Sequence, residues 1–286
     1  PVLPYMASRG CYWGKCTFCT HSFIYDSHYR KENEERVAEE LDYLGKRYKT
    51  KYFTFSDEAI SPNAFDRMSK AILSQGVEMR ALGMLKFESD SIETVELFKN
   101  MYKAGFLMLF FGLESANDRI LSIIEKGCDQ ATEKRVLENS SLAGIWNHLY
   151  LFFGFPTEEK HEAQETIDFT VQHSELGDGT IHSVGQSVFS LEKDSAIYHD
   201  PAKFQINRIL RDPERDMAII FDYEIEKGMT KDEVLDVYEN FDKTIESNFP
   251  SRKTWNYLSR EHFLLYLDHY GREEILNMTR PLVQST

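Results

Sequence analysis

The stretch "FLMLFFGLESANDRILSIIEKG", residues 106–127, contains one complete unit of the fold that the sequence predicts. Its first eight residues are apolar, and a run of that length is typical of a buried strand. A polar segment with a helical pattern follows, and Gly127 is the kind of residue that ends a helix. A buried strand that leads directly into a helix is the building block of a parallel sheet covered by helices.

The same alternation extends in both directions along the chain. Further strand-like segments lie at 2–6, 51–55, 77–85, 148–155 and 181–189. Amphipathic stretches between them predict helices at 33–48, 62–72, 92–101, 131–143 and 158–173. Strands separated by helices need crossover connections and therefore run parallel. Six such units are too few for a closed eight-stranded barrel. We therefore predict an α/β fold, a partial (β/α)6 barrel with parallel strands.

The alternation stops near residue 190, which suggests a second region. Apolar residues then recur at helical spacing, as at Val234, Tyr238, Phe241 and Ile245. We predict a barrel core at 1–190 and a mainly helical C-terminal region at 191–286, joined by a loop at about 190–217. The chain begins at Pro1 without an initiator Met, which is compatible with a fragment that lacks an upstream domain.

Composition excludes several classes of protein. The 33 basic and 47 acidic residues give a net charge of −14, which disfavours nucleic acid as a partner. No run of about 18 apolar residues predicts a membrane span, and no signal peptide is visible. The chain has four cysteines, and three of them lie within nine residues, which is typical of metal or redox chemistry in a reducing compartment. We therefore expect a cytoplasmic protein.

The cysteines lie in "SRGCYWGKCTFCTH", residues 8–21, directly after the first predicted strand. Four residues separate Cys11 from Cys16, and two separate Cys16 from Cys19. A zinc site would need a fourth ligand, which His21 could supply. An iron–sulfur cubane held by three thiolates would keep one iron open for a substrate or cofactor. The spacing alone leaves both interpretations open.

The segment "SRGCYWGKCTFC" resembles the cluster loop of the radical S-adenosylmethionine (radical SAM) superfamily. In that family three cysteines hold a 4Fe–4S cluster and SAM binds the fourth iron, which implies that Cys11, Cys16 and Cys19 are the metal ligands. An aromatic residue before the last cysteine is typical, and Phe18 occupies that place. The usual first gap has three residues, whereas this loop has four. Gly14 could absorb the extra residue, because glycine tolerates unusual backbone angles.

Three downstream segments resemble motifs of the same family, in the same order. By resemblance, Asp57 and Glu58 in "FTFSDEAI" would receive the amino group of SAM. Glu114 and Ser115 in "FFGLES" would face its ribose or methionine part, and Gly154 in "FFGFP" would line the adenine. Each residue also has a plainer interpretation, because Ser and Asp commonly cap helices at such positions. The resemblance extends from about residue 4 to 190.

The resemblance implies an oxygen-sensitive enzyme with a 4Fe–4S cluster and SAM as cofactors. Such an enzyme cleaves SAM reductively and carries out a radical modification of a small-molecule or peptide substrate, with electrons from a donor such as flavodoxin or ferredoxin. The sequences of these motifs are most like those of the branch whose members often carry an upstream cobalamin-binding domain. By that analogy, cobalamin in a domain outside this chain and methyl transfer are expected.

Two alternatives stand beside this interpretation. A tRNA methylthiotransferase-like enzyme would normally carry further cysteines and a basic RNA-binding domain, whereas this chain is acidic and has only Cys128 in addition to the loop. A non-catalytic, zinc-stabilised binding module would explain the cysteine loop. It would leave the ordered downstream motifs unexplained.

Overall fold

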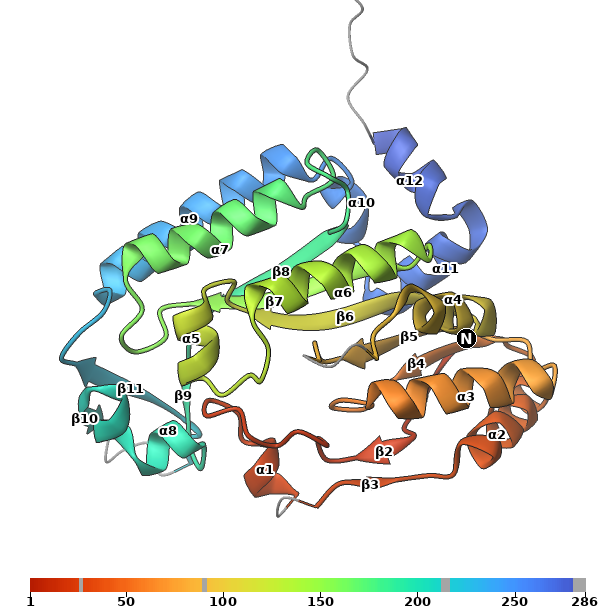
Figure 1. Ribbon diagram of the computed structural model, residues 1–286, viewed down its shortest axis with the longest axis horizontal. Helices are drawn as coiled ribbons and strands as arrows, with labels where there is room; N and C mark the ends of the chain where they lie inside the picture. The colour runs from red at the N-terminus through yellow and green to blue at the C-terminus, as the bar shows by residue number, and fades with distance from the viewer. Residues whose placement is uncertain (26–27, 89–91, 212–216, 280–286) are drawn as a thin grey trace, which may run out of the picture.

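The computed structural model describes residues 1–25, 28–88, 92–211 and 217–279 (Figure 1). Six parallel strands form one open sheet in the order β1-β4-β5-β6-β7-β8. They are β1 (Val2–Tyr5), β4 (Tyr52–Phe55), β5 (Arg80–Leu85), β6 (Phe106–Glu114), β7 (Trp146–Phe153) and β8 (Ser183–Val188). Each strand of this sheet lies beside the next one along the chain, the usual arrangement for short connections. The predicted partial barrel of six parallel strands is confirmed.

Helices form the crossovers between these strands. They are α2 (Glu34–Tyr48), α3 (Pro62–Ser74), α4 (Val95–Ala104), α5 (Asp118–Ile123), α6 (Gln130–Leu142) and α7 (Lys160–Gln172). The predicted apolar stripes face the sheet: Phe65, Met68 and Ile72 of α3 are buried. Pro62 occupies the first turn of α3, and the Ser61 hydroxyl accepts a hydrogen bond from the Ala64 N–H. Local sequence signals therefore set where this helix begins.

The two faces of the sheet have different partners. The Asn147 side chain donates to the Leu137 carbonyl of α6, 3.0 Å away, so this side of β7 faces the crossover helices. The neighbouring Trp146 ring instead packs edge-on against Phe263, with the ring centroids 4.8 Å apart. Successive side chains of a strand point to opposite faces. We call the face that carries Trp146, His148, Tyr150 and Phe152 the inner face.

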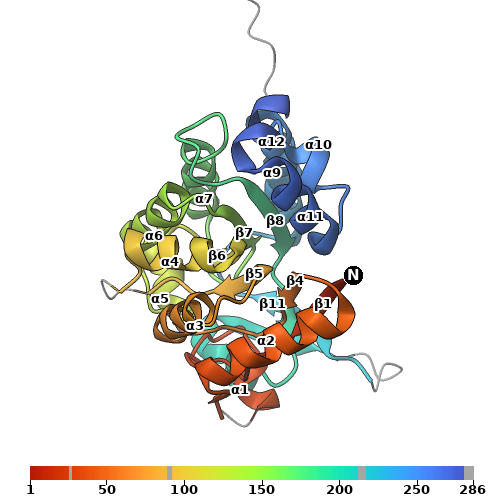
Figure 2. The same ribbon diagram turned by 90° about the vertical axis from the view of Figure 1, so that its right-hand side faces the viewer.

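The chain ends in four helices: α9 (Lys231–Asn248), α10 (Arg252–Trp255), α11 (Arg260–Tyr270) and α12 (Arg272–Thr279). Figure 2 shows α4, α6 and α7 on one side of the sheet and α11 on the other, so α11 covers the inner face. Phe241 of α9 and Phe263 of α11 belong to the same buried cluster as the strands. The predicted C-terminal helices are present. No helix among the described residues combines the length and apolar character that crossing a membrane requires.

The segment from 191 to 225 differs from the prediction of a loop leading into a mainly helical region. It forms an antiparallel sheet in the order β10-β11-β9. Its elements are β9 (Leu191–Glu192), α8 (Ala196–His199), the 3-10 helix η1 (Pro201–Phe204), β10 (Ile206–Leu210) and β11 (Ile220–Ile225). The strand β11 alternates between exposed and half-buried residues and so contains no continuous apolar run. Because β11 is short and half exposed, a rule based on continuous apolar runs does not predict it.

Three short elements complete the N-terminal part. They are β2 (Ser8–Arg9), β3 (Arg30–Lys31) and α1 (His21–Ile24). The strands β2 and β3 pair antiparallel, and the cysteine loop lies between β2 and α1. After β1 the chain therefore runs through β2, the cysteine loop and α1, and it returns in β3 beside β2.

Candidate functional site at the C-terminal edge of the sheet

The three clustered cysteines lie at the C-terminal edge of the parallel sheet. Cys11 forms an isolated parallel bridge with Ala59, just beyond the end of β4. Cys11, Cys16 and Cys19 are free, half-buried thiols. Burial raises the pKa of Cys16, and burial, with the nearby Cys16 and Cys11 adding to it, raises the pKa of Cys19 to about 12. The three thiols share one loop, and among the described residues they do not form a ready-made metal position.

The carboxylate of Asp57 fixes the start of the cysteine loop. Asp57 follows β4 and is only 4% exposed. One oxygen accepts from the Ala7 N–H at 3.1 Å, and the other accepts from the N–H and the hydroxyl of Ser8, at 2.5 and 2.6 Å. Burial raises the pKa of this carboxyl, and the hydrogen bonds act against that shift. Both oxygens are therefore engaged by the loop's own backbone.

The middle of the loop is anchored to the segment that follows α5. The Trp13 ring nitrogen donates to the Glu125 carbonyl at 2.8 Å. The Thr17 N–H donates to the Ile124 carbonyl at 3.0 Å, and the Thr17 carbonyl accepts from the Ile197 N–H of α8. The loop is therefore held between the end of the fourth βα unit and the 191–225 segment. Gly14 has a φ of +61°, a left-handed conformation in which glycine is favoured.

Phe18 lies on the inner face of the sheet. Its ring packs edge-on against Phe152 of β7, with centroids 5.1 Å apart. Phe152 in turn approaches Phe155 and Phe189, which belong to the second buried cluster of the protein. The residue before the last cysteine thus links the loop to an aromatic cluster at the ends of β7 and β8.

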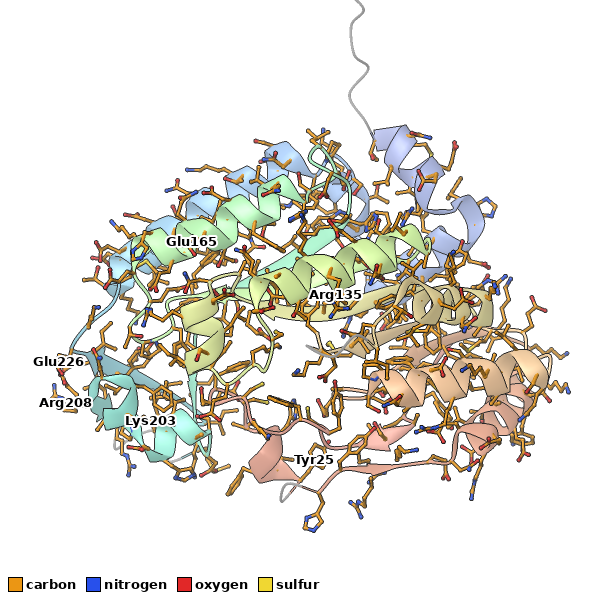
Figure 3. The ribbon with its side chains drawn as sticks, in the orientation of Figure 1. Tyr25, Arg135, Glu165, Lys203, Arg208 and Glu226 are labelled. Atoms are coloured by element: carbon orange, nitrogen blue, oxygen red, sulfur yellow. The ribbon has the colours of Figure 1, made fainter. Side chains whose placement is uncertain are left out.

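Glu58 is directed toward α1. Its carboxylate lies 2.9 Å from the Nε2 atom of His21 and accepts from the Tyr25 hydroxyl at 3.2 Å. Tyr25 can be found beside α1 in Figure 3. The imidazole that could have completed a zinc site is therefore paired with a carboxylate. Within the described parts of the chain, no three His, Cys, Asp or Glu side chains gather around a point where one metal ion could bind.

Glu114 forms a buried ion pair with Lys126. The carboxylate and the ammonium lie 2.8 Å apart, and their side chains are 15% and 7% exposed. Burial by itself lowers the pKa of Lys126, but the Glu114 carboxylate and the nearby Cys16 raise it above its usual value. Glu114 has a φ of +62°, at the end of β6 where the pairing with β7 is irregular. A β-carbon on Gly112 would collide with both charged groups, so the ion pair has room only because residue 112 is glycine.

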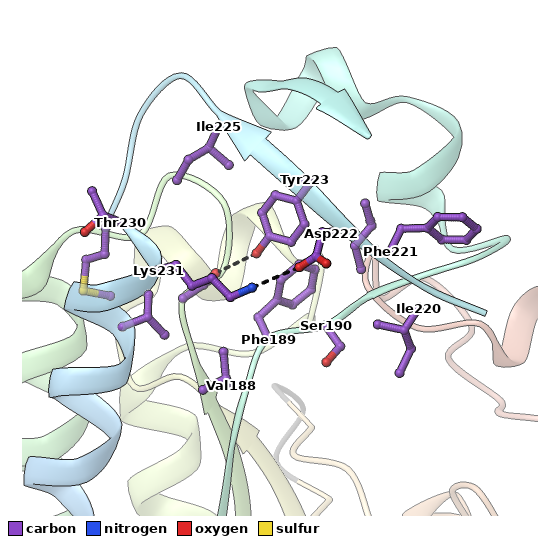
Figure 4. A pocket seen from close by; sticks show the side chains of 14 residues that line it. Val188, Phe189, Ser190, Ile220, Phe221, Asp222, Tyr223, Ile225, Thr230 and Lys231 are labelled. Carbon is purple, nitrogen blue, oxygen red and sulfur yellow. Dashed lines mark hydrogen bonds and ion pairs between the residues drawn. The ribbon is translucent and has the colours of Figure 1, made fainter. Parts of the chain in front are cut away.

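Ser115 and Gly154 have clear local partners. Ser115 is fully buried, and its hydroxyl lies 3.1 Å from the Thr166 hydroxyl of α7. The Gly154 N–H donates to the Glu158 carboxylate at 2.6 Å, and burial, the largest influence, raises the pKa of Glu158 to about 7. Gly154 also lines a cavity of about 290 Å³ between β8, β11 and the start of α9 (Figure 4). In that cavity the Tyr223 hydroxyl donates to the Gly154 carbonyl at 3.4 Å.

Two lysines beside the cysteine loop were not predicted as site residues. The Lys86 ammonium lies 4.3 Å from the centroid of the Trp13 ring, and that of Lys15 lies 4.6 Å from it. Lys86 is buried and donates to the Phe87 carbonyl at 2.7 Å. The available sequence signal was a lysine directly after the apolar strand β5. Arg135, labelled in Figure 3, donates to the Glu88 carbonyl at 2.9 Å.

The structure therefore brings most of the predicted residues to one edge of the sheet, although with different immediate partners. Phe18 lies in the cysteine loop, Glu58 is paired with His21 at its end, and the charges of Glu114 and Lys126 act on Cys16. Asp57 binds the backbone at the start of the loop, and the Ser115 hydroxyl contacts Thr166 of α7. Gly154 lines the neighbouring cavity. Direct contacts of these residues with SAM stay a prediction.

Solved structures with a similar fold include cobalamin-dependent proteins. The cobalamin-dependent S-adenosylmethionine radical enzyme OxsB superposes with a TM-score of 0.68 at 16% identity, covering 97% of this chain and 46% of OxsB. The radical S-adenosylmethionine methyltransferase TsrM from Kitasatospora setae, with cobalamin and a [4Fe–4S] cluster bound, gives a TM-score of 0.66 at 14% identity, covering 98% and 61%. At identities this low, the similarity shows a shared fold and nothing about function.

Sequence relatives match a little more than half of this chain. An uncharacterized methyltransferase of Pyrococcus horikoshii is 30% identical over 167 residues, which cover 57% of this chain and 35% of the relative. A protein of Methanocaldococcus jannaschii named as a methylthiotransferase is 28% identical over 180 residues, covering 59% and 39%. The chain thus spans well under half the length of these curated relatives. The profile of the Radical SAM superfamily matches residues 5–170, from the end of β1 into α7. Because this match includes the cysteine loop and more than half of the sequence, the chain belongs to the radical SAM superfamily.

Proposed function

We propose that this chain is the radical SAM part of an enzyme in which Cys11, Cys16 and Cys19 hold a 4Fe–4S cluster with SAM beside it. The observation that carries the proposal is the loop of three free thiols, fixed at the C-terminal edge of a parallel sheet. When bound, the reduced cluster cleaves SAM reductively and supplies the radical chemistry of the family. The chain's own residues hold the cluster, orient SAM and exclude water.

The donor set fits a cluster better than a single zinc ion. Thiolates are the ligands that iron–sulfur clusters use, and three of them leave one iron open. A structural zinc ion needs four ligands gathered on one point. The three thiols do not complete such a set by themselves, and because the Nε2 atom of His21 is paired with Glu58, only its Nδ1 atom could add a fourth ligand. The proposed metal ligands are the three cysteines.

The surrounding residues divide into two groups by what they touch. Phe18, Glu58, Glu114 and Gly154 are proposed to surround SAM, because each has polar or aromatic atoms at the edge of the sheet near the loop. Asp57 and Ser115 are proposed to orient this group from behind. Asp57 holds the backbone of Ala7 and Ser8, and Ser115 holds the start of α5 by accepting from the Asn117 N–H.

Methyl transfer is the proposed reaction, with cobalamin held by a segment outside this chain. The names of the Pyrococcus relative and of TsrM support it, as do the cobalamin-containing structures that share the fold. The substrate is proposed to be a small molecule or peptide, and the electron donor a flavodoxin or ferredoxin. A chain with free, oxidisable thiols suits the reducing cytoplasm.

A methylthiotransferase is the second candidate, which the name of the Methanocaldococcus relative favours. Such an enzyme normally needs further cysteines. Cys128 is the remaining cysteine of the sequence, and its sulfur lies 3.9 Å from a carboxylate oxygen of Glu133, so this chain offers one further thiol at most. Methyl transfer is therefore preferred.

The test is reductive SAM cleavage by the purified chain. The protein is prepared without oxygen, reconstituted with iron and sulfide, and given dithionite and SAM. We expect bound iron and the formation of 5′-deoxyadenosine. Cys16→Ala should lose both, whereas the matched control Cys128→Ala should retain both. Zinc at about one ion per chain, with no iron uptake and no 5′-deoxyadenosine, would contradict the proposal.

A further inference from the structure

Three rings on the inner face of the sheet form one continuous surface. Phe110 of β6 pairs in register with His148 of β7, and Tyr150 lies two residues further along β7. The centroid distances are 5.0 Å for Phe110–His148, 5.7 Å for Phe110–Tyr150 and 4.7 Å for His148–Tyr150. We call Phe110, His148 and Tyr150 the aromatic bed. Surfaces of this kind suit flat apolar groups, because rings pack well in stacked and edge-on arrangements.

Glycines flank Tyr150 on both neighbouring strands, and their missing side chains give room to the groups around them. Tyr150 pairs in register with Gly112 of β6 and with Gly185 of β8. A β-carbon at Gly185 would lie 3.0 Å from the Tyr150 ring and 3.3 Å from the Nε2 atom of His148. His148, Tyr150 and both glycines are only partly buried. Phe110 is buried, so the accessible part of this face is formed by His148, Tyr150 and the two glycines.

One ring nitrogen of His148 is left without a partner. Its Nδ1 atom lies 2.7 Å from the Ser183 hydroxyl, which also accepts from the Trp146 ring nitrogen at 2.8 Å. The Ser183 hydrogen then has Nδ1 as its acceptor, so the proton of the neutral imidazole is assigned to Nε2. Burial, with a smaller contribution from Arg260, lowers the pKa of His148 to about 3 and keeps the ring neutral. Nε2 is buried and has no hydrogen-bond partner within the described residues.

Arg260 extends from the first turn of α11 over the same bed. Its guanidinium carbon lies 5.5 Å from the centroid of Phe110, and its positive charge acts on both His148 and Tyr150. None of the ion pairs among the described residues involves Arg260. The acidic residue of α11 that reaches the sheet, Asp268, is paired with Lys51 and Arg80 instead. The bed thus carries one cation without a counter-charge.

We propose that the aromatic bed and Arg260 bind a substrate that has a flat apolar group and a carboxylate. The carboxylate pairs with the guanidinium of Arg260 and accepts from the Nε2–H of His148, while the flat group lies against the partly exposed Tyr150. A planar guanidinium matches a carboxylate in shape, and a single positive charge matches a monoanion. The proposal rests on the proposed function, because the bed lies between α11 and the Glu114–Lys126 pair beside Cys16.

The test uses benzoate as the probe and benzamide as its neutral counterpart of the same shape. Binding to the full chain is measured by ligand-observed NMR titration, without SAM. We expect saturable benzoate binding below about 10 mM and at least about 10-fold weaker binding of benzamide. Arg260→Ala should weaken benzoate about 10-fold and so remove the difference between the two probes. Arg208→Ala, an exposed arginine paired with Glu224 on β10–β11, is the control and should change nothing.

A second variant tests the imidazole separately. His148→Phe keeps the ring surface but removes both ring nitrogens, and because the buried Ser183 hydroxyl loses its acceptor, the variant is compared at a temperature where it is fully folded. Benzoate should bind about 3-fold to 10-fold more weakly. Equal binding of benzoate and benzamide, an unchanged benzoate affinity in Arg260→Ala, or no saturable benzoate binding would each overturn the proposal. Benzoate binding without SAM cleavage would instead overturn the proposed function alone, and SAM cleavage without benzoate binding would overturn this inference alone.

Discussion

The six-membered part of the Trp13 indole lies directly against the α-carbon of Gly127. A β-carbon at Gly127 would overlap the ring, and the backbone there has a φ of +76°. Both the space and the conformation therefore require glycine. The contact fastens the cysteine loop to the segment after α5, together with the hydrogen bond from Trp13 to the Glu125 carbonyl. The glycine that looked like a plain helix terminator in the sequence is part of the site.

The first prediction concerns this contact. Gly127→Ala should lower the free energy of unfolding by about 2–4 kcal/mol, because it adds both backbone strain and overpacking. The displaced Trp13 should also loosen the loop, so less iron should remain after reconstitution and desalting. Chemical unfolding and iron analysis measure the two effects.

Gly76→Ala is the matched control for this prediction. Gly76 also has a positive φ, of +66°, but no atom lies within 4 Å of the place its β-carbon would occupy. It should lose only about 1 kcal/mol, the cost of the backbone strain, and keep its iron. If both variants lose the same stability, the Trp13–Gly127 contact contributes nothing.

The parts of this protein that sequence predicted well are those with local signals. Continuous apolar runs marked β6 and β7, helical spacing marked α3 and α9, and the spacing of three cysteines marked the loop. The β9–β11 sheet had no such signal, because β11 alternates along its length and is exposed on one side. A short period-two pattern in a polar segment is easily taken for a loop.

The partners of the site residues could not be predicted, because they depend on distant segments. Asp57 was expected near SAM, but its oxygens are used by Ala7 and Ser8, about 50 positions earlier. Lys126 is placed beside Glu114 and buried only by the course of the chain after α5. Sequence motifs indicated which residues gather at the edge of the sheet, whereas register and burial decide what each one touches.

The second prediction tests the support that Asp57 gives the cysteine loop. Asp57→Asn keeps the size but replaces one acceptor oxygen by an NH2 group, which would face an N–H of Ala7 or Ser8. Unfolding free energy should fall by about 1–3 kcal/mol, because a buried donor is left unpaired. Iron content should fall with it. Asp66→Asn, which breaks only an ion pair with Lys70 on α3, should stay within about 0.5 kcal/mol.

The third prediction concerns the pH dependence of stability. Glu93 is fully buried, and one of its oxygens has no partner among the described residues. Burial, with the neighbouring Glu88 carboxylate adding to it, raises its pKa to about 8 from the usual 4.5. A raised acid pKa means that the folded protein keeps a proton which the unfolded chain releases. Its stabilising effect is full below pH 4.5 and is lost as the pH rises toward 8.

Glu93→Gln removes this titration and keeps the acceptor for the Glu88 N–H, which lies 2.7 Å from the carboxylate. The wild type should lose up to about 1.4 kcal/mol per pH unit across that window relative to the variant. Urea unfolding at pH 5, 6, 7 and 8 (~1-unit steps) measures the difference. Glu96→Gln, an exposed residue of α4, is the control and should follow the wild-type curve. Parallel curves for wild type and Glu93→Gln would show that Glu93 does not titrate in this range.

The fourth prediction concerns the buried Glu114–Lys126 pair. Lys126→Met keeps the length of the side chain but leaves the Glu114 carboxylate without its counter-charge, at a side-chain exposure of 15%. Unfolding free energy should fall by about 3–5 kcal/mol, the usual result of breaking a buried pair. Lys134→Met, which removes an exposed pair with Glu138 on α6, should change it by less than about 0.5 kcal/mol.

The double variant Glu114→Gln with Lys126→Met separates the pair's structural role from its proposed place beside SAM. With both charges gone, no buried charge is left unpaired, so most of the lost stability should return. The formation of 5′-deoxyadenosine should remain low, because the carboxylate proposed to face SAM is still missing. A double variant that recovers both stability and SAM cleavage would show that the pair only holds the end of β6 to the segment after α5, and the proposed role of Glu114 would fall.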